Sequence, residues 1–305
     1  MEDSGASRVM VVDDEALVLD VMRKLLSKEP GLTVATLENG EQARDVLEFN
    51  RFDLLITDKN LPGMGGVELI HQARRRWPML EAVMITGYAS AESVIAAFAA
   101  GASDYLLKPF DDIRVVRAKV RAALDRRVAR LENREQARKT ARAAAALLGS
   151  GQEAPDAAWQ DLEERFQRYE RSIHEGGQGD VRVVGAPQEV EALRAAGIGA
   201  ALCELRNPLL DQADVVVLTT GGSEWLTVAE RLKGSNADVV LVSGPEAGLA
   251  DLLEAVNLRL ELVPGGSASG PLLVDRVRSL LLRRQVERAQ VDLAQALERF
   301  SSQLR

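Results

Sequence analysis

Five polar side chains that could act together in phosphoryl chemistry each follow a separate short apolar run, namely Asp13, Asp14, Asp58, Thr86 and Lys108. If those runs are parallel strands of one sheet, their carboxyl ends meet at one edge and bring these side chains together. Three neighbouring carboxylates stay ionised only if a cation neutralises them, and oxygen ligands favour Mg²⁺. With the Lys108 ammonium on the other side, Asp58 is placed to attack phosphorus as a nucleophile.

Thr86 and Tyr105 are interpreted as a switch that would respond to this chemistry. The Thr86 hydroxyl can donate a hydrogen bond to a phosphoryl oxygen, and its inward movement would leave space for an aromatic ring. Tyr105 is the ring that we expect to fill that space. Phosphorylation would thereby change side-chain packing at the end of the sheet.

The first 110 residues alternate short apolar runs with segments of helical period. Leu17, Val21 and Leu25 recur at steps of four, and residues 91–100 are rich in alanine, which indicates helices between the runs. Strands that alternate with helices predict a flavodoxin-like, doubly wound parallel sheet with right-handed crossovers. The five strands are expected at Arg8–Val12, Thr33–Thr36, Phe52–Thr57, Ala82–Ile85 and Asp104–Leu107.

Four motifs in this region resemble the receiver domain of bacterial two-component response regulators. They are Val-Val-Asp-Asp at 11–14, Ile-Thr-Asp at 56–58, Leu-Pro-Gly-Met-Gly-Gly at 61–66 and Gly-Ala-Ser-Asp-Tyr-Leu-Leu-Lys-Pro-Phe at 101–110. The resemblance implies that a histidine kinase donates a phosphoryl group to Asp58. It also implies that Mg²⁺ is bound by Asp14, Asp58 and the backbone carbonyl of Asn60, with Asp13 acting through water.

Two other interpretations of the first region were weighed. A flavodoxin-like domain whose edge carboxylates are merely solvated would need the spacings of all five side chains to agree by chance. A phosphatase of the haloacid dehalogenase type also uses an aspartyl nucleophile, but it carries Asp-x-Asp at the strand end. This chain has Asp58, Lys59 and Asn60 there, so the general acid is missing.

Residues 181–270 repeat the alternation of strands and helices without the chemistry. In the predicted alignment the acid pair becomes Gly185 and Ala186, Asp58 becomes Thr220, and Lys108 becomes Val263. Such a domain would be a degenerate, or pseudo-, receiver; an unrelated small α/β domain, including a nucleotide-binding one, is the alternative. Strands are expected at Val181–Val184, Ala200–Cys203, Asp214–Leu218, Asp238–Val242 and Leu258–Val263, with the second crossover helix shortened to Asn207–Gln212.

Long helices are predicted between and after the two sheets. Asp111–Leu148 lacks Pro and Gly, Pro155–Glu175 carries an apolar heptad seam, and a similar seam near the end includes Leu293 and Phe300. Residues 111–150 hold 11 basic and 5 acidic side chains (net +6), and residues 151–180 hold 3 and 8 (net −5). The two helices are therefore expected to pair as a hairpin, or between chains as a homodimer.

Composition excludes several other classes of protein. The net charge of −8 and the acidic neighbour of the Arg-rich stretch make nucleic-acid binding unlikely. The longest uncharged stretch is Leu262–Val274, far short of the roughly 20 apolar residues of a membrane span. One cysteine allows no internal disulfide, and Glu2 and Asp3 do not suit a signal peptide, so a cytoplasmic protein is expected.

These observations predict two flavodoxin-like five-strand parallel sheets joined by a long helical or coiled-coil spacer. The expected domains are a phosphorylatable receiver at 5–125, a helical linker at 126–178, a pseudo-receiver at 179–275 and an extended helix at 276–305. The expected function is that of a response regulator, not an enzyme, which signals to a downstream protein partner and has no DNA-binding domain. The alternative functions are a phosphorylation-independent scaffold and an enzyme with a site in the second lobe.

Overall fold

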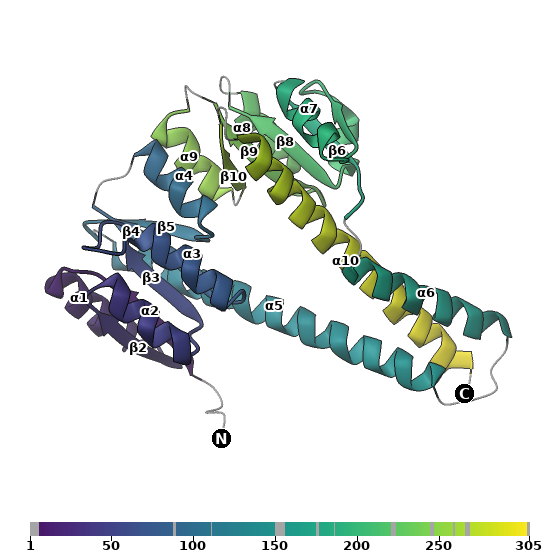
Figure 1. The fold of residues 1–305 in the computed structure, drawn as a ribbon, viewed down its shortest axis with the longest axis horizontal. Coiled ribbons are helices and arrows are strands. Elements are labelled where there is room, and N and C mark those ends of the chain that lie inside the picture. Colours follow the sequence, from purple (N-terminus) through teal and green to yellow (C-terminus); the bar gives the residue numbers. More distant parts are fainter. Residues whose placement is uncertain are drawn as a thin grey trace. The chain divides into compact units, whose positions relative to one another are not determined.

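The computed structural model of the chain describes residues 6–87, 90–110, 112–149, 156–174, 177–185, 187–220, 224–244, 247–258, 260–265 and 269–303 (Figure 1). The chain divides into two compact units. One consists of residues 1–131 with 248–256, and the other of residues 132–247 with 257–305.

The three central strands of the first sheet are apolar and largely buried, as parallel strands covered by helices on both faces must be, whereas its two edge strands are only partly buried. All neighbouring strands are parallel, and their order is β2-β1-β3-β4-β5. This confirms the predicted doubly wound topology. The strands are β1 (Ser7–Val12), β2 (Leu32–Leu37), β3 (Leu54–Asp58), β4 (Glu81–Thr86) and β5 (Asp104–Leu107).

Helices follow each strand of the first sheet. The apolar sides of α1 (Ala16–Leu26) and α5 (Ile113–Leu148) pack with one face of the sheet around Val9, Ile56 and Ile85. The remaining helices are α2 (Gly40–Phe49), α3 (Gly66–Arg76) and α4 (Ala91–Ala99). Asn39 and Ser90 cap α2 and α4 by accepting backbone N–H bonds, so that these helices begin directly after their loops.

The second sheet has the same topology as the first. Its order, β10-β9-β8-β6-β7, is again 2-1-3-4-5 when its strands are counted from its own beginning, and every pair is parallel. The strands are β6 (Val181–Val184), β7 (Ala200–Leu202), β8 (Val215–Thr219), β9 (Asp238–Ser243) and β10 (Glu261–Pro264).

The helices of the second sheet also follow the predicted pattern. α7 (Pro187–Ala195) and α10 (Ser269–Gln303) pack with one face of the sheet, as α1 and α5 do with the first. The second crossover is only a short 3₁₀ helix, Pro208–Gln212, as its reduced length predicted. The other helices in this part of the sequence are α8 (Glu224–Leu232) and α9 (Leu249–Asn257), most of which is grouped with the first unit.

The strand register corrects the predicted equivalent of Asp58 by one residue. Asp58 pairs with the residue before Thr86, and Thr219 pairs with the residue before Ser243. Since Thr86 and Ser243 each end the fourth strand of their sheet, Thr219 rather than Thr220 corresponds to Asp58.

The predicted equivalent of Lys108 is also corrected, by two residues. The residue before Lys108 pairs with Thr86, and the residue before Gly265 pairs with Ser243. Gly265 rather than Val263 therefore corresponds to Lys108. The aligned position has lost its whole side chain, not only its charge.

The basic residues of the first half of α5 pair with carboxylates of the first domain, which differs from the predicted pairing with the acidic helix that follows. Glu81, which begins β4 and is 1% exposed, pairs with Arg126 and Arg130. Arg127 Nη1 lies 2.7 Å from Asp53 Oδ1, just before β3. These ion pairs attach α5 to the amino-terminal edge of the sheet, opposite the edge that carries Asp58.

The last helix of the second domain is attached to its sheet in the same manner. Arg283 and Arg284 of α10 lie 2.7 and 2.6 Å from the carboxylate of Asp238, which begins β9. Arg288 pairs with Asp214, directly before β8. The two domains thus share the arrangement of their final helix as well as their strand order.

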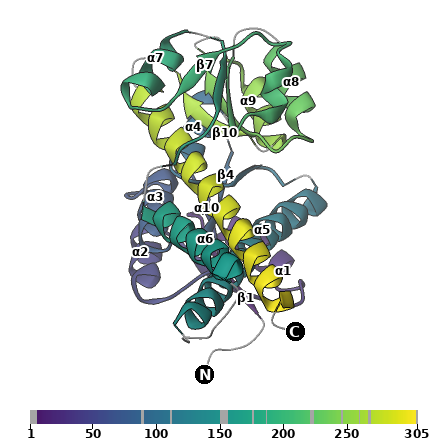
Figure 2. The same cartoon turned by 90° about the vertical axis from the view of Figure 1, so that its right-hand side faces the viewer.

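A bundle of three helices forms a separate apolar core in the second unit, from the distal half of α5, from α6 (Asp156–His174) and from the distal half of α10 (Figures 1 and 2). Leu162 of α6 and Leu293 of α10 are fully buried there, and the rings of Trp159 and Phe300 lie 5.8 Å apart. The apolar seams predicted for α6 and α10 therefore meet each other within one chain. No helix among the described residues is long and apolar enough to cross a membrane.

Candidate functional site

The carboxyl edge of the first sheet brings Asp13, Asp58 and Lys108 together. Lys108 Nζ lies 2.8 Å from Asp13 Oδ2 and 2.9 Å from Asp58 Oδ1. Asp13 follows β1, Asp58 ends β3 and Lys108 follows β5, and both aspartates are almost completely buried. Three of the sequence-predicted site residues, which come from three strands, are thus in direct contact.

Burial and charge act on these groups in opposite directions. Burial raises the pKa of the Asp13 carboxyl, while the hydrogen bond and charge of Lys108 lower it in part. Burial alone would lower the pKa of Lys108, but the carboxylates of Asp13, Glu15 and Asp58 outweigh this effect and raise it above the usual value for lysine. Lys108 therefore stays a cation at every physiological pH.

The loop after β3 fixes the Asp58 side chain from its other side. The backbone N–H of Asn60 donates a hydrogen bond to Asp58 Oδ2, so the two oxygens of Asp58 have different partners. Gly66 begins α3 against the backbone carbonyl of Asp58, and a Cβ at this position would overlap that carbonyl. The glycine of the predicted motif is therefore required for close approach of α3 to the phosphoacceptor candidate.

Thr86 and Tyr105 lie together in the interior. Both side chains are buried, and Tyr105 hydrogen-bonds with Thr86 and, at 3.3 Å, with Ser93 of α4. Burial raises the pKa of the Tyr105 phenol. The Tyr105 ring is thus already in the interior beside Thr86.

Some of the oxygen atoms at this edge of the sheet are suitable ligands for a hard divalent cation such as Mg²⁺. Asp13 and Asp58 supply two carboxylates and Asn60 a backbone carbonyl, and Mg²⁺ is commonly held by one or two carboxylates with water as the remaining ligands. Asp14 is exposed and has no ion pair among the described residues. In the described part of the chain no three His, Cys, Asp or Glu side chains are grouped closely enough to hold a metal ion.

Glu15 and Ser93 contact the site although the sequence analysis did not select them. Glu15 Oε1 lies 2.8 Å from Lys108 Nζ, and Ser93 contacts Tyr105 as described above. Glu15 directly follows the acid pair, and this position was the only available signal for it. Nothing in the sequence pattern indicated Ser93, since its role depends on where α4 packs.

The corresponding edge of the second sheet lacks all three groups of the lysine–carboxylate cluster. Gly185 and Thr219 take the places of Asp13 and Asp58, and a Cβ at Gly185 would overlap the Thr219 side chain. Gly265 takes the place of Lys108 and lies directly against the backbone of Ser243. At Gly185 and Gly265 there is therefore no room for the side chains that Asp13 and Lys108 carry in the first sheet.

Comparison with known proteins places the first domain in a family. Residues 9–121 match the family described as "Response regulator receiver domain". The DNA-binding transcriptional regulator NtrC of Escherichia coli K12 is 34% identical over 130 residues, which are 43% of this chain and 26% of that protein. The hydrogenase transcriptional regulatory protein HoxA of Cupriavidus necator is 36% identical over 111 residues, which are 36% of this chain and 22% of that protein.

The chain thus spans about a quarter of the length of the curated relatives it matches. Among solved structures, a CheY-like receiver domain protein of Methanospirillum hungatei JF-1 is 31% identical with a TM-score of 0.39, and the match covers 41% of this chain and 98% of that one. The family match covers every residue of the cluster formed by Asp13, Asp58 and Lys108. Residues 9–121 are accordingly the receiver domain of a two-component response regulator.

Proposed function

We propose that the receiver domain accepts a phosphoryl group on Asp58 from a histidine kinase, and that the protein then signals through contacts with a downstream protein partner. The observation that carries the proposal is the contact of Lys108 Nζ with both Asp13 and Asp58. An ammonium beside a buried carboxylate neutralises the charge that develops on a phosphoryl group during transfer.

In the proposed transfer, one carboxylate oxygen of Asp58 forms a bond to phosphorus while the bond between phosphorus and the kinase imidazole nitrogen breaks. The imidazole leaves with that electron pair and takes up a proton from water. Lys108 neutralises the transferred oxygens, and the Thr86 hydroxyl donates a hydrogen bond to one of them. Asp13, Asp14, Asp58 and the Asn60 carbonyl would hold Mg²⁺, which would supply further positive charge to the transferred oxygens.

The output is assigned to the helical spacer and the second domain, acting as a pseudo-receiver. The ion pairs of Arg126, Arg127 and Arg130 with the receiver sheet engage much of the Arg-rich surface of α5. This arrangement supports protein contact over nucleic-acid binding, since paired guanidinium groups gain less by contacting phosphates. A homodimer that uses the exposed faces of the helices remains part of the proposal.

The test is labelling of the full chain by a radioactive acyl phosphate in the presence of Mg²⁺. We expect label on the wild type and on Asp45→Asn, an exposed carboxylate of α2, and none on Asp58→Asn. Label that persists on Asp58→Asn, or that maps to the second domain after proteolysis, contradicts the assignment.

One observation favours a phosphorylation-independent scaffold as the second candidate function. The Tyr105 ring is already buried beside Thr86, so no inward movement of the ring is needed to bury it. Light scattering and partner capture with and without beryllium fluoride distinguish the two functions. A change in size or in partner affinity supports signalling through Asp58, and identical behaviour in both conditions supports the scaffold.

A further inference from the structure

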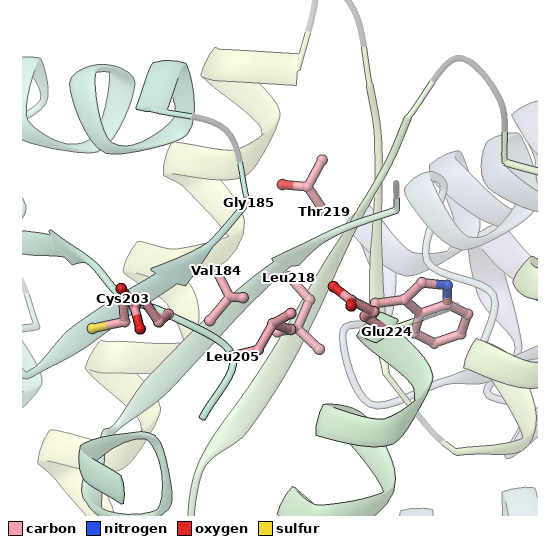
Figure 3. Close-up of a pocket in the computed structure, with 9 residues that line it drawn as sticks. Val184, Gly185, Cys203, Leu205, Leu218, Thr219 and Glu224 are labelled. Carbon is pink, nitrogen blue, oxygen red and sulfur yellow. The ribbon is translucent and has the colours of Figure 1, made fainter. Parts of the chain in front are cut away.

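The second domain contains a pocket at the point where its strand order reverses (Figure 3). In doubly wound sheets, ligands bind beyond the carboxyl ends of the strands at this place. The pocket has a volume of about 320 Å³ and lies between the ends of β6 and β8, the loop after β7 and the start of α8. Ligand sites of about 300–1,000 Å³ are usual, so its size suits one side chain or a small molecule rather than a dinucleotide.

The interior of the pocket is apolar. Figure 3 shows Val184, Leu205 and Leu218 in its centre, with Glu224 on one side and Cys203 on the other. Trp225, which is 4% exposed, adds an aromatic ring to the lining. An occupant therefore needs an apolar portion that can contact these side chains.

The charged side chains that line the pocket are both acidic. Glu204 and Glu224 are exposed at its rim, and neither forms an ion pair with any residue that the structure describes. Glu224 also begins α8, where a carboxylate already compensates the partial positive charge of the helix end. Thr219 Oγ1 is buried in the same lining and has no hydrogen-bond partner in the described part of the chain.

We infer that this pocket binds a basic side chain, arginine or lysine, presented by a protein partner. The apolar stem of such a side chain would contact Val184 and Leu218, and its cationic head would pair with Glu204 and Glu224. Phosphate-bearing ligands are disfavoured by the same two carboxylates, which argues against the nucleotide-binding alternative for this domain. The inference rests on the proposed output role of the second domain but not on phosphorylation of Asp58.

The test is an NMR titration of the unphosphorylated full chain with the peptide acetyl-Leu-Arg-Leu-amide. The indole N–H signals of the three tryptophans are followed, and the signal absent from Trp225→Phe is assigned to Trp225. We expect a saturable shift of that signal. The matched peptide with citrulline, which has the same shape as arginine but no charge, should bind about tenfold more weakly, as loss of a paired charge implies.

Glu204→Gln/Glu224→Gln is expected to weaken binding of the arginine peptide about tenfold, and Glu230→Gln, on the exposed side of α8, to leave it unchanged. Far-UV circular dichroism verifies that the double variant is folded, and each single substitution provides a second, milder variant. Equal binding of the citrulline peptide, or unchanged affinity in the folded double variant, overturns the inference. Tighter binding of free agmatine than of the arginine peptide overturns the assignment to a protein partner.

Labelling at Asp58 separates this inference from the proposed phosphoryl transfer. The double variant is expected to take up label from the acyl phosphate as the wild type does. Loss of peptide binding with intact labelling shows that the substitutions act on the pocket and not on the phosphoryl site. Intact binding in Asp58→Asn shows that the pocket forms without phosphorylation of the receiver.

Discussion

Asp13 Oδ2 and Asp58 Oδ1 contact the same atom, Lys108 Nζ, at 2.8 and 2.9 Å. Both carboxylates are buried, so the ammonium compensates two charges that would otherwise repel each other. The two buried carboxylates therefore depend on a nearby positive charge. A bound divalent cation would supply part of this charge in place of the Lys108 ammonium.

Lys108→Met should lower the free energy of unfolding of the receiver domain by about 3–5 kcal/mol in the presence of EDTA, because two buried carboxylates lose their counterion. Excess Mg²⁺ should restore more stability in this variant than in the wild type. Urea unfolding in both buffers measures the difference. Lys24→Met removes an exposed pair with Asp20 and should cost no more than about 1 kcal/mol. An equal response of wild type and Lys108→Met to Mg²⁺ would contradict this view of the site.

Arg126→Met/Arg130→Met should destabilise the receiver domain by about 3–5 kcal/mol, because Glu81 is buried and would be left without a partner. Adding Glu81→Gln to the double variant should recover most of the loss, since a neutral amide is less costly to bury than an unpaired carboxylate. Thermal unfolding of the three proteins measures both effects. No recovery in the triple variant would show that the guanidinium groups stabilise α5 by packing alone.

Gly265→Ala should destabilise the second domain by about 1–3 kcal/mol, because the new Cβ would overlap the backbone carbonyl of Ser243. Gly234→Ala is the matched control, since a Cβ there meets no atom within 4 Å. Chemical unfolding of both variants measures the contrast. Equal stability of the two would mean that the loops of the second sheet can move apart at little cost.

A pH titration followed by the absorbance of tyrosinate should show one phenol that ionises above the usual pKa of about 10. The reason is that burial raises the pKa of Tyr105. The folded state therefore holds this proton more firmly than the unfolded state. Stability from this group is complete below pH of about 10 and falls as pH rises beyond it. Tyr105→Phe should lack both the late ionisation and this part of the stability loss. An unchanged titration curve in Tyr105→Phe would contradict the buried position of the ring.

Leu293→Ala should destabilise the three-helix bundle by about 2–5 kcal/mol, because Leu293 is fully buried between α6 and the distal half of α5. Val291→Ala, on the same helix and 55% exposed, should change stability by less than about 0.5 kcal/mol. Hydrogen exchange of α6 amides measures the local effect. Equal protection in both variants would show that the helices are held together elsewhere.

The strands and helices were predictable because their signals are local. Strands buried on both faces give uninterrupted apolar runs, and each of the ten predicted runs overlaps an observed strand. The edge residues Asp13, Asp58 and Lys108 followed directly, because parallel strands that end together must bring their next residues together. The register of the second sheet was wrong by one residue at Thr220 and by two residues at Val263, since insertions and deletions in loops leave spacing alone ambiguous.

Long-range partners could not be predicted in the same way. The charge pattern of α5 indicated an acidic partner, and the next helix was the nearest candidate in sequence. The actual partners of its first half include Asp53, just before β3, and Glu81, at the start of β4, which meet α5 only after the sheet has formed. The contact of Ser93 with Tyr105 and the intramolecular pairing of α6 with α10 depend on packing in the same way.

The three-helix bundle joins segments that leave the ribosome at very different times. Ala144 and Leu162 have emerged well before Leu293 and Phe300, which complete their core. A nascent or truncated chain without the last turns of α10 would expose the apolar sides of both earlier helices to chaperones and proteases. The core of the bundle therefore closes only after Leu293 and Phe300 have been synthesised.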